Sequence, residues 1–169
     1  MENGLGILVI VGFVVVYFLW KKATNAAGKK FTQSVLQPKA HKSGQLITSQ
    51  VTTYEVETSK DSVYQAIKNG IVAAPEQPKM PAKLYLDQAT GSTLAYAYGR
   101  MGYRVGFTYV IACRPNGDDA TTVICEFSKW ARVSGIVHHQ KEMKQLVAGV
   151  ESILRRLDPN LSVSVSNGN

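Results

Sequence analysis

Residues 138–157 read HHQKEMKQLVAGVESILRRL, and this stretch decides the fold. Its apolar side chains recur at the spacing of one helical face: Met143, Leu146, Val147, Val150, Ile153, Leu154 and Leu157. Asp158 and Pro159 end the pattern. The stretch predicts a helix of about 20 residues, roughly 30 Å long, that must bury one face against another element. Gly149 in its middle costs about 1 kcal/mol relative to alanine, which indicates either close approach of another backbone or simple tolerance.

The residues before this helix predict an antiparallel sheet. Four runs suited to strands lie at 83–90, 93–99, 103–114 and 121–133, and PNGDD at 115–119 is a strong hairpin turn. Alternation groups on one face Leu94, Tyr96 and Tyr98 in the second run, Val105, Phe107, Tyr109, Ile111 and Cys113 in the third, and Val123, Cys125, Phe127, Ala131 and Val133 in the fourth. The opposite face of the fourth run carries Ile124, Glu126, Trp130 and Arg132.

The earlier part of the domain predicts one strand, one short helix and a loop. Residues 47–58 are typical of a strand, a helix begins after Ser59 and ends near Gly70, and three prolines make 73–81 a loop. The tail, residues 161–169, is either an edge strand or a frayed end. The fold class is therefore α+β.

The order of these elements resembles the START and Bet v 1-like superfamily, also described as helix-grip or polyketide cyclase-like. YEVETSKDSVYQAI at 54–67 and the helix at 138–157 carry the resemblance, which extends over residues 47–157. It implies an antiparallel sheet wrapped on a long C-terminal helix, with a lipid or other apolar molecule bound between them. The chain departs from the family in having fewer predicted strands and a proline loop at 75–81 in place of a second short helix.

The N-terminus predicts a transmembrane anchor, residues 1–20. Residues 3–20 read NGLGILVIVGFVVVYFLW, without a charge, and as a helix they reach about 27 Å across a hydrocarbon core of roughly 30 Å. The predicted anchor residues are Leu5, Val9, Phe13, Tyr17 and Trp20. A cleaved signal peptide is the alternative, but its basic residues precede the apolar run, whereas here the lysines come after it. A buried core helix is disfavoured because the stretch has no polar face.

The distribution of charge predicts the topology. The chain has 19 basic and 12 acidic residues, and six of the lysines fall in a linker at 21–45 that has no acid. We therefore expect a single-pass cell-membrane protein with its N-terminus outside and its C-terminal domain in the cytoplasm. Lipid headgroups would contact Lys21, Lys22, Lys29 and Lys30.

The remaining residues, 46–169, argue against nucleic acid. They hold 13 basic and 11 acidic residues, a net charge of +2. GFTYV at 106–110 loosely matches an RNA-binding strand motif, but Val105 occupies the place of its basic residue and the element order is wrong. We therefore predict no nucleic-acid partner.

The chain lacks the common catalytic motifs for nucleotides, acyl transfer and metals. His138 and His139 are adjacent, so on a helix they point about 100° apart and cannot share a metal well. Glu55 and Glu57 share a strand face and are expected to be solvated, and Cys113 and Cys125 are expected to be small buried side chains. We predict no cofactor, no metal site and no catalytic residue.

These observations divide the chain into an anchor (1–20), a basic linker (21–45), a START-like domain (46–160) and a tail (161–169). The favoured function is a membrane-anchored cytoplasmic module that binds an apolar ligand or lipid between sheet and helix. The predicted pocket lining is Tyr96, Tyr98, Phe107, Tyr109, Phe127, Met143, Val147 and Val150. The alternative is a non-catalytic accessory or scaffold subunit of a membrane complex, with Ile124, Trp130 and Arg132 as interface residues; an enzyme is a third option.

Overall fold

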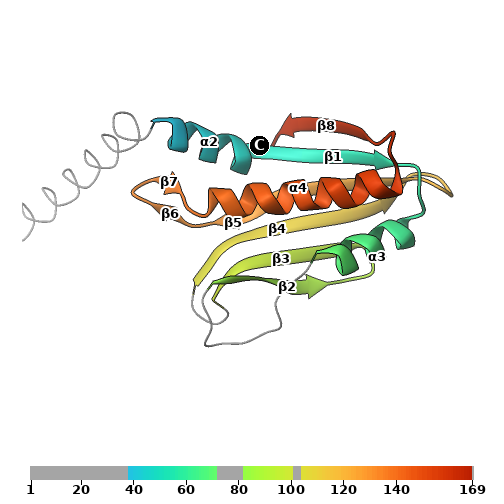
Figure 1. The fold of residues 1–169 in the computed structure, drawn as a ribbon, viewed down its shortest axis with the longest axis horizontal. Coiled ribbons are helices and arrows are strands. Elements are labelled where there is room, and N and C mark those ends of the chain that lie inside the picture. Colours follow the sequence, from blue (N-terminus) through green and yellow to red (C-terminus); the bar gives the residue numbers. More distant parts are fainter. Residues whose placement is uncertain (1–37, 72–81, 101–103, 169) are drawn as a thin grey trace, which may run out of the picture.

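The computed structural model of the chain describes residues 38–71, 82–100 and 104–168. They form one six-stranded antiparallel sheet in the order β2-β3-β4-β5-β1-β8 (Figure 1). The strands are β1 (Gln50–Val56), β2 (Lys83–Ala89), β3 (Thr93–Arg100), β4 (Arg104–Pro115), β5 (Thr121–Trp130) and β8 (Ser162–Asn167). A short hairpin joins β6 (Arg132–Val133) to β7 (Ile136–Val137), and the helices are α2 (Pro38–Ser49), α3 (Lys60–Gly70) and α4 (Gln140–Leu157).

The long C-terminal helix α4 lies across one face of this sheet, as Figure 1 shows. Most of its apolar stripe is buried, with Met143, Val150 and Leu154 at 0% exposure, whereas Leu157 at the end of the helix is 36% exposed. The buried side chains complete a core with the inward residues of the strands, among them Tyr96 and Phe107. The predicted α+β class, with a large antiparallel sheet and a C-terminal helix, is confirmed, and it fits a helix-grip arrangement.

Helix α2 occupies a place where the sequence predicted no helix. It covers 38–49, whereas 21–45 was predicted as linker and 47–58 as strand; the strand begins only at Gln50. Pro38 suits the first helical position, because its missing N–H has no partner there in any helix. The helix packs beside β7 and the start of α4, so tertiary contacts stabilise a segment whose own sequence is polar.

Two β-bulges reverse the predicted alternation. In β4, Gly106 is an extra residue, because Phe107 pairs with Tyr98 while Val105 pairs with Gly99; Val105 is consequently 42% exposed. In β5, the extra residue is Ser128.

The second bulge corrects the prediction for the end of the fourth run. Trp130 lies opposite Phe107 and packs against the core, although alternation placed it on the outer face. The strand ends at Trp130, so Val133 falls in the β6 hairpin and is 57% exposed instead of sharing the inward face.

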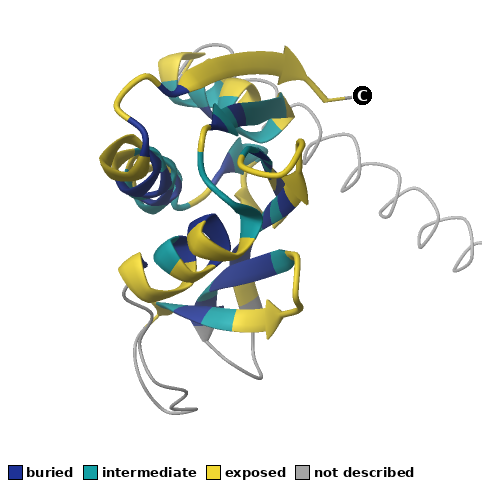
Figure 2. Cartoon of the chain, turned by 90° about the vertical axis from the view of Figure 1, so that its right-hand side faces the viewer, coloured by how far each residue is buried: buried dark blue, intermediate teal, exposed yellow. Residues whose placement is uncertain are grey.

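The tail resolves an alternative left open by the sequence. Ser162–Asn167 forms β8, which pairs antiparallel with β1 at one edge of the sheet. All six of its residues are exposed (Figure 2).

Among residues 38–71, 82–100 and 104–168, no helix is long and apolar enough to span a membrane. The predicted anchor (1–20) and the headgroup-contacting lysines between 21 and 30 lie outside the described residues. The anchor and its topology therefore stay predictions.

Candidate ligand-binding site

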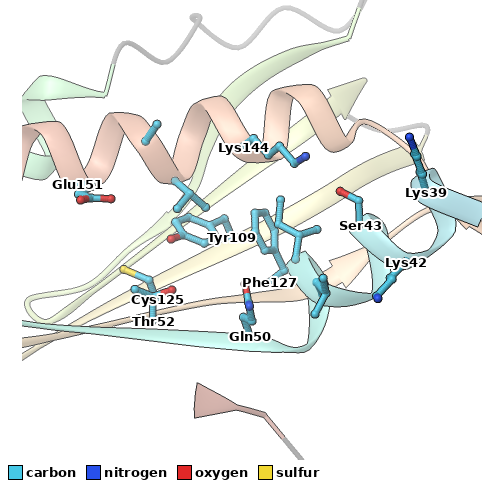
Figure 3. A pocket seen from close by; sticks show the side chains of 14 residues that line it. Lys39, Lys42, Ser43, Gln50, Thr52, Tyr109, Cys125, Phe127, Lys144 and Glu151 are labelled. Atoms are coloured by element: carbon cyan, nitrogen blue, oxygen red, sulfur yellow. The ribbon is translucent and has the colours of Figure 1, made fainter. Parts of the chain in front are cut away.

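A groove of about 610 Å³ lies between α2, α4 and the strands β4, β5 and β1 (Figure 3). We call it the α2 groove. Its lining residues are Lys39, Lys42, Ser43, Leu46, Ile47, Gln50, Thr52, Tyr109, Cys125, Phe127, Lys144, Val147, Ala148 and Glu151. The volume is in the range of roughly 300–1,000 Å³ that is usual for small-molecule sites.

The helices α4 and α2 and the sheet form the groove, and in each of them the lining residues recur at the regular spacing of one face. On α4, the lining residues from Lys144 to Glu151 follow the i, i+3, i+4, i+7 pattern of one helical face. On α2, those from Lys39 to Ile47 follow the same pattern. The floor comes from alternate inward residues of the sheet, which are buried because α4 and α2 cover them.

A close seam fixes the α2 wall in place. A Cβ at Gly44 would lie 2.8 Å from Val137 Cβ, so only glycine allows α2 to approach β7 this closely. Gln140 Nε2 then donates hydrogen bonds to the carbonyl oxygens of Ala40 (2.9 Å) and Val137 (3.0 Å). The side chain of α4's first residue thus ties α2 to the body of the domain.

The floor of the groove is apolar and neutral. Tyr109, Cys125 and Phe127 are almost completely buried. Burial raises the pKa of the Tyr109 hydroxyl well above its usual value of 10.0, and burial raises the pKa of the Cys125 thiol to about 12. A hydrogen bond joins the hydroxyl to the thiol, so these polar atoms satisfy each other and carry no charge at neutral pH.

The charged side chains divide between the two ends of the groove. Lys39, Lys42 and Lys144 are exposed and lie toward one end, while Glu151 lies at the other (Figure 3). The Glu151 carboxylate accepts from Arg155 at 2.8 Å and 2.9 Å, so an arginine already balances its charge.

A second, smaller groove of about 380 Å³ lies on the opposite side of α4, toward α3. It contains Leu84, Tyr98, Phe107 and Leu146 among its apolar residues, with Glu142 and Arg156 among its charged ones. Helix α4 therefore separates two grooves.

The predicted pocket residues are distributed over three places. Tyr109, Phe127 and Val147 line the α2 groove, and Tyr98 and Phe107 line the second groove. Tyr96 of β3 and Met143 and Val150 of α4 line neither groove, and all three are 0% exposed between the helix and the sheet. The space directly between helix and sheet is thus packed, and the described grooves lie on its flanks.

Sequence reasoning missed the residues that α2 contributes. Lys39, Lys42, Ser43, Leu46 and Ile47 are spaced i, i+3, i+4, i+7 and i+8. This is a helical face, and the pattern was present in the segment interpreted as linker and strand. Thr52, Cys125, Lys144, Ala148 and Glu151 carried no signal for a groove, because their role depends on where α2 packs.

The histidine and glutamate residues considered above as catalytic or metal-binding candidates have structural contacts instead. His139 precedes α4 in a left-handed conformation, and its ring lies 4.9 Å from that of Tyr98. Glu55 accepts hydrogen bonds from Asn116 and Thr122, while Glu57 lies beyond the end of β1. In the part of the chain that the structure describes, no group of three or more histidine, cysteine or acidic side chains is placed to hold a metal.

The two cysteines lie inside the sheet. Cys113 and Cys125 are buried and not disulfide-bonded. Burial raises the pKa of the Cys113 thiol to about 11, so neither cysteine has the exposed, acidic thiol of a reactive site.

The chain matches no protein-family profile and no curated protein sequence. Solved structures similar to it include the Aha1 dimer from Colwellia psychrerythraea, at 10% identity over 64% of this chain and 96% of that one, with a TM-score of 0.43. CalU16 from Micromonospora echinospora is 11% identical over 63% of this chain and 70% of that one, with a TM-score of 0.40. The Zhui aromatase/cyclase from a Streptomyces species is 12% identical over 63% of this chain and 94% of that one, with a TM-score of 0.29.

The class that the fold and the groove define is an α+β domain of helix-grip type with ligand-sized grooves beside its long helix. The solved structures are similar to this chain only at low identity and low TM-score. At these identities and TM-scores they carry no argument about a ligand or an activity, and membership of the START and Bet v 1-like superfamily stays a prediction.

Proposed function

We propose that this chain is a membrane-anchored binding module that holds an apolar ligand in the α2 groove. The observation that carries the proposal is the groove's apolar, uncharged floor of Tyr109, Cys125 and Phe127. Leu46, which lines the groove, is 48% exposed. An apolar ligand would remove this surface from water.

The energetics favour a ligand with an extended apolar part. Each methylene removed from water contributes about 0.8 kcal/mol, so about ten methylenes supply roughly 8 kcal/mol. Association and ordering cost an estimated 4–15 kcal/mol, so a shorter chain would bind weakly. The Tyr109 hydroxyl and the Cys125 thiol are uncharged, so an apolar chain meets no charge on that part of the floor, while Gln50 and Thr52 of β1 add polar side chains to the lining.

Site-resolved photolabelling tests this proposal on the full chain reconstituted in phosphatidylcholine nanodiscs. The probe is dodecanol carrying a diazirine in its chain, and mass spectrometry locates the labelled peptides. We expect labelling of the β5 and α4 peptides that contain Phe127 and Val147. Labelling confined to other parts of the chain would contradict the proposal.

A pair of variants assigns the labelling to one groove. Ala148 is exposed and lines the α2 groove, so Ala148→Trp fills this groove without disturbing the buried core. Gln145→Trp is the matched control, because Gln145 is also exposed on α4 but lines the second groove. We expect Ala148→Trp to abolish labelling in the α2 groove and Gln145→Trp to leave it unchanged; equal effects would contradict the assignment.

The anchor part of the proposal rests on the sequence. Residues 3–20 are uncharged and Lys21 and Lys22 come directly after them, an order that predicts a cytoplasmic location for the rest of the chain. We expect the chain to stay in the membrane fraction after alkaline carbonate extraction. Protease should digest the domain only after the cells are permeabilised, and digestion in intact cells would overturn the orientation.

The alternative function, an accessory or scaffold subunit, is favoured by one observation. Strand β8 is a sheet edge whose residues are all exposed, with Val163 at 39% and Val165 at 57%. An unprotected edge strand is a template for pairing with another chain. A photoreactive residue in place of Val163 would cross-link a partner subunit in membranes, and adding Val165→Pro to that variant should abolish the cross-link; a domain that cross-links to nothing counts against this function.

A further inference from the structure

We infer that the occupant of the α2 groove is a single-chain amphiphile with an oxyanion head, and that Lys39, Lys42 and Lys144 hold this head. The inference rests on the proposed function and adds the chemical class of the ligand. It concerns the described lysines of α2 and α4, not the basic residues nearer the predicted anchor.

Lys39, Lys42 and Lys144 lie toward the same end of the groove because two helices line it (Figure 3). Lys39 and Lys42 lie one turn apart on α2, on the face that lines the groove. Lys144 lies on the lining face of α4, near the end where this helix begins (Figure 3). Two separate elements thus supply positive charge to the same end of one cavity.

These charges have no opposite charge within the domain. In the part of the chain that the structure describes, none of the three lysines forms an ion pair. The single acidic residue of the lining, Glu151, lies at the far end and is paired with Arg155. An oxyanion bound beside the lysines would therefore meet uncompensated positive charge, and it would meet no competing carboxylate at that end.

The part of the floor formed by Tyr109, Cys125 and Phe127 disfavours a charged head. The hydroxyl of Tyr109 and the thiol of Cys125 already bond each other, and an unpaired charge buried on this floor would be strongly disfavoured. Apolar residues continue from the lysines along both walls, through Leu46 on α2 and Val147 on α4. The ligand therefore lies with its head at the lysines and its chain over the floor.

Four ligands with one chain and different heads test the inference. Dodecanoate, dodecyl phosphate, dodecanol and dodecyltrimethylammonium compete against the diazirine dodecanol probe in the full chain in phosphatidylcholine nanodiscs. We expect both anions to displace the probe at concentrations at least about tenfold below that of dodecanol, a difference of about 1.4 kcal/mol. Dodecyltrimethylammonium should be the weakest competitor. The order of the two anions distinguishes a carboxylate head from a phosphate head.

Two triple variants separate the groove lysines from net charge. The first is Lys39→Gln/Lys42→Gln/Lys144→Gln. The control, Lys68→Gln/Lys129→Gln/Lys141→Gln, removes the same charge from exposed lysines outside the α2 groove. Because a ligand partitions equally into lipid for all variants, the comparison isolates the protein's contribution.

We expect the groove variant to bind dodecanol like the wild type but to lose the preference for anions, and the control to keep it. Anions that compete no better than dodecanol, or two triple variants that behave alike, would overturn the inference and leave the binding of an apolar chain intact. Failure of the dodecanol probe to label the α2 groove at all would instead refute the proposed function on which the inference rests.

Discussion

Substitution of Gly44 by alanine tests how the α2 wall is held. Gly44 lies in the middle of α2 and faces β7 and the first residue of α4. An added Cβ would lie 2.8 Å from Val137 Cβ and 2.9 Å from Gln140 Nε2. Carbon atoms in contact are about 3.5–4.0 Å apart, so α2 must move outward by about 1 Å.

The expected cost combines three contributions. Overpacking a buried contact costs about 1–3 kcal/mol. Displacing the Gln140 amide loses its two hydrogen bonds, at about 1 kcal/mol each. The better helix propensity of alanine returns about 1 kcal/mol, so docking of α2 should weaken by about 2–4 kcal/mol.

Hydrogen exchange measured by mass spectrometry on the full chain in nanodiscs gives the local free energy. We expect backbone amides of α2 to exchange between about thirtyfold and several hundredfold faster, while those of β4 and β5 stay unchanged. Photolabelling of the groove should fall in parallel, because α2 is one of its walls.

Gly149→Ala is the matched control. Gly149 is also in the middle of a helix, but an added Cβ there would meet nothing within 4 Å. No other backbone in the described ranges approaches this glycine closely, so the helix does not need glycine here. Gly149→Ala should therefore stabilise the domain by about 0.5–1 kcal/mol. Unchanged exchange in Gly44→Ala, or equal destabilisation by both substitutions, would refute the reasoning.

Three further predictions concern buried groups. Burial raises the pKa of Cys113 to about 11 and that of Cys125 to about 12. Both thiols should therefore resist alkylation by iodoacetamide at about pH 8 until denaturant is added, and intact-protein mass spectrometry measures the adducts. Rapid alkylation of the folded chain would contradict the packing. Burial lowers the pKa of His139 from 6.5, so the unfolded state binds more protons and the free energy of unfolding should fall as pH drops below about 6.5. His139→Asn, whose side chain suits the left-handed backbone at this position, should weaken the pH dependence measured by urea unfolding. An identical pH profile in the variant would exclude His139 as the source of that dependence. Asp158 is 6% exposed and accepts from two backbone amides at 2.9 Å, so Asp158→Ala should lower the free energy of unfolding by about 2–4 kcal/mol, and a loss below about 0.5 kcal/mol would show that the two bonds are not needed.

Much of the fold could be predicted because its signals are local. The stripe of α4 is a pattern within 18 residues, and α3 ended near Gly70 as expected. The hairpin between β4 and β5 results from its turn residues. Each of these depends on neighbours in the chain, and sequence patterns report such neighbours well.

The errors came from information carried by distant partners. The bulges at Gly106 and Ser128 are visible only in the register with an adjacent strand, and each reverses the alternation beyond it. Helix α2 depends on a seam with Val137 and Gln140, which lie about 90–100 residues further along the chain. Trp130 was consequently placed outside and the start of α2 was not recognised.

The predicted pocket residues do not all reach a groove. Aromatic residues on the inward face do line grooves, yet Tyr96 and Met143 fill the space under α4 completely. Which inward residues stay accessible depends on how three helices share one sheet face. That arrangement is set by packing volumes, which residue patterns do not give.

One consequence of the α2 wall concerns the chain that leads into it. Helix α2 is both a side of the groove and the first described element after residue 37. A groove that exists only while α2 is docked has an apparent affinity scaled by the docked fraction. A force transmitted to α2 through the preceding residues would therefore lower occupancy of the groove, and a bound ligand would oppose the undocking of α2.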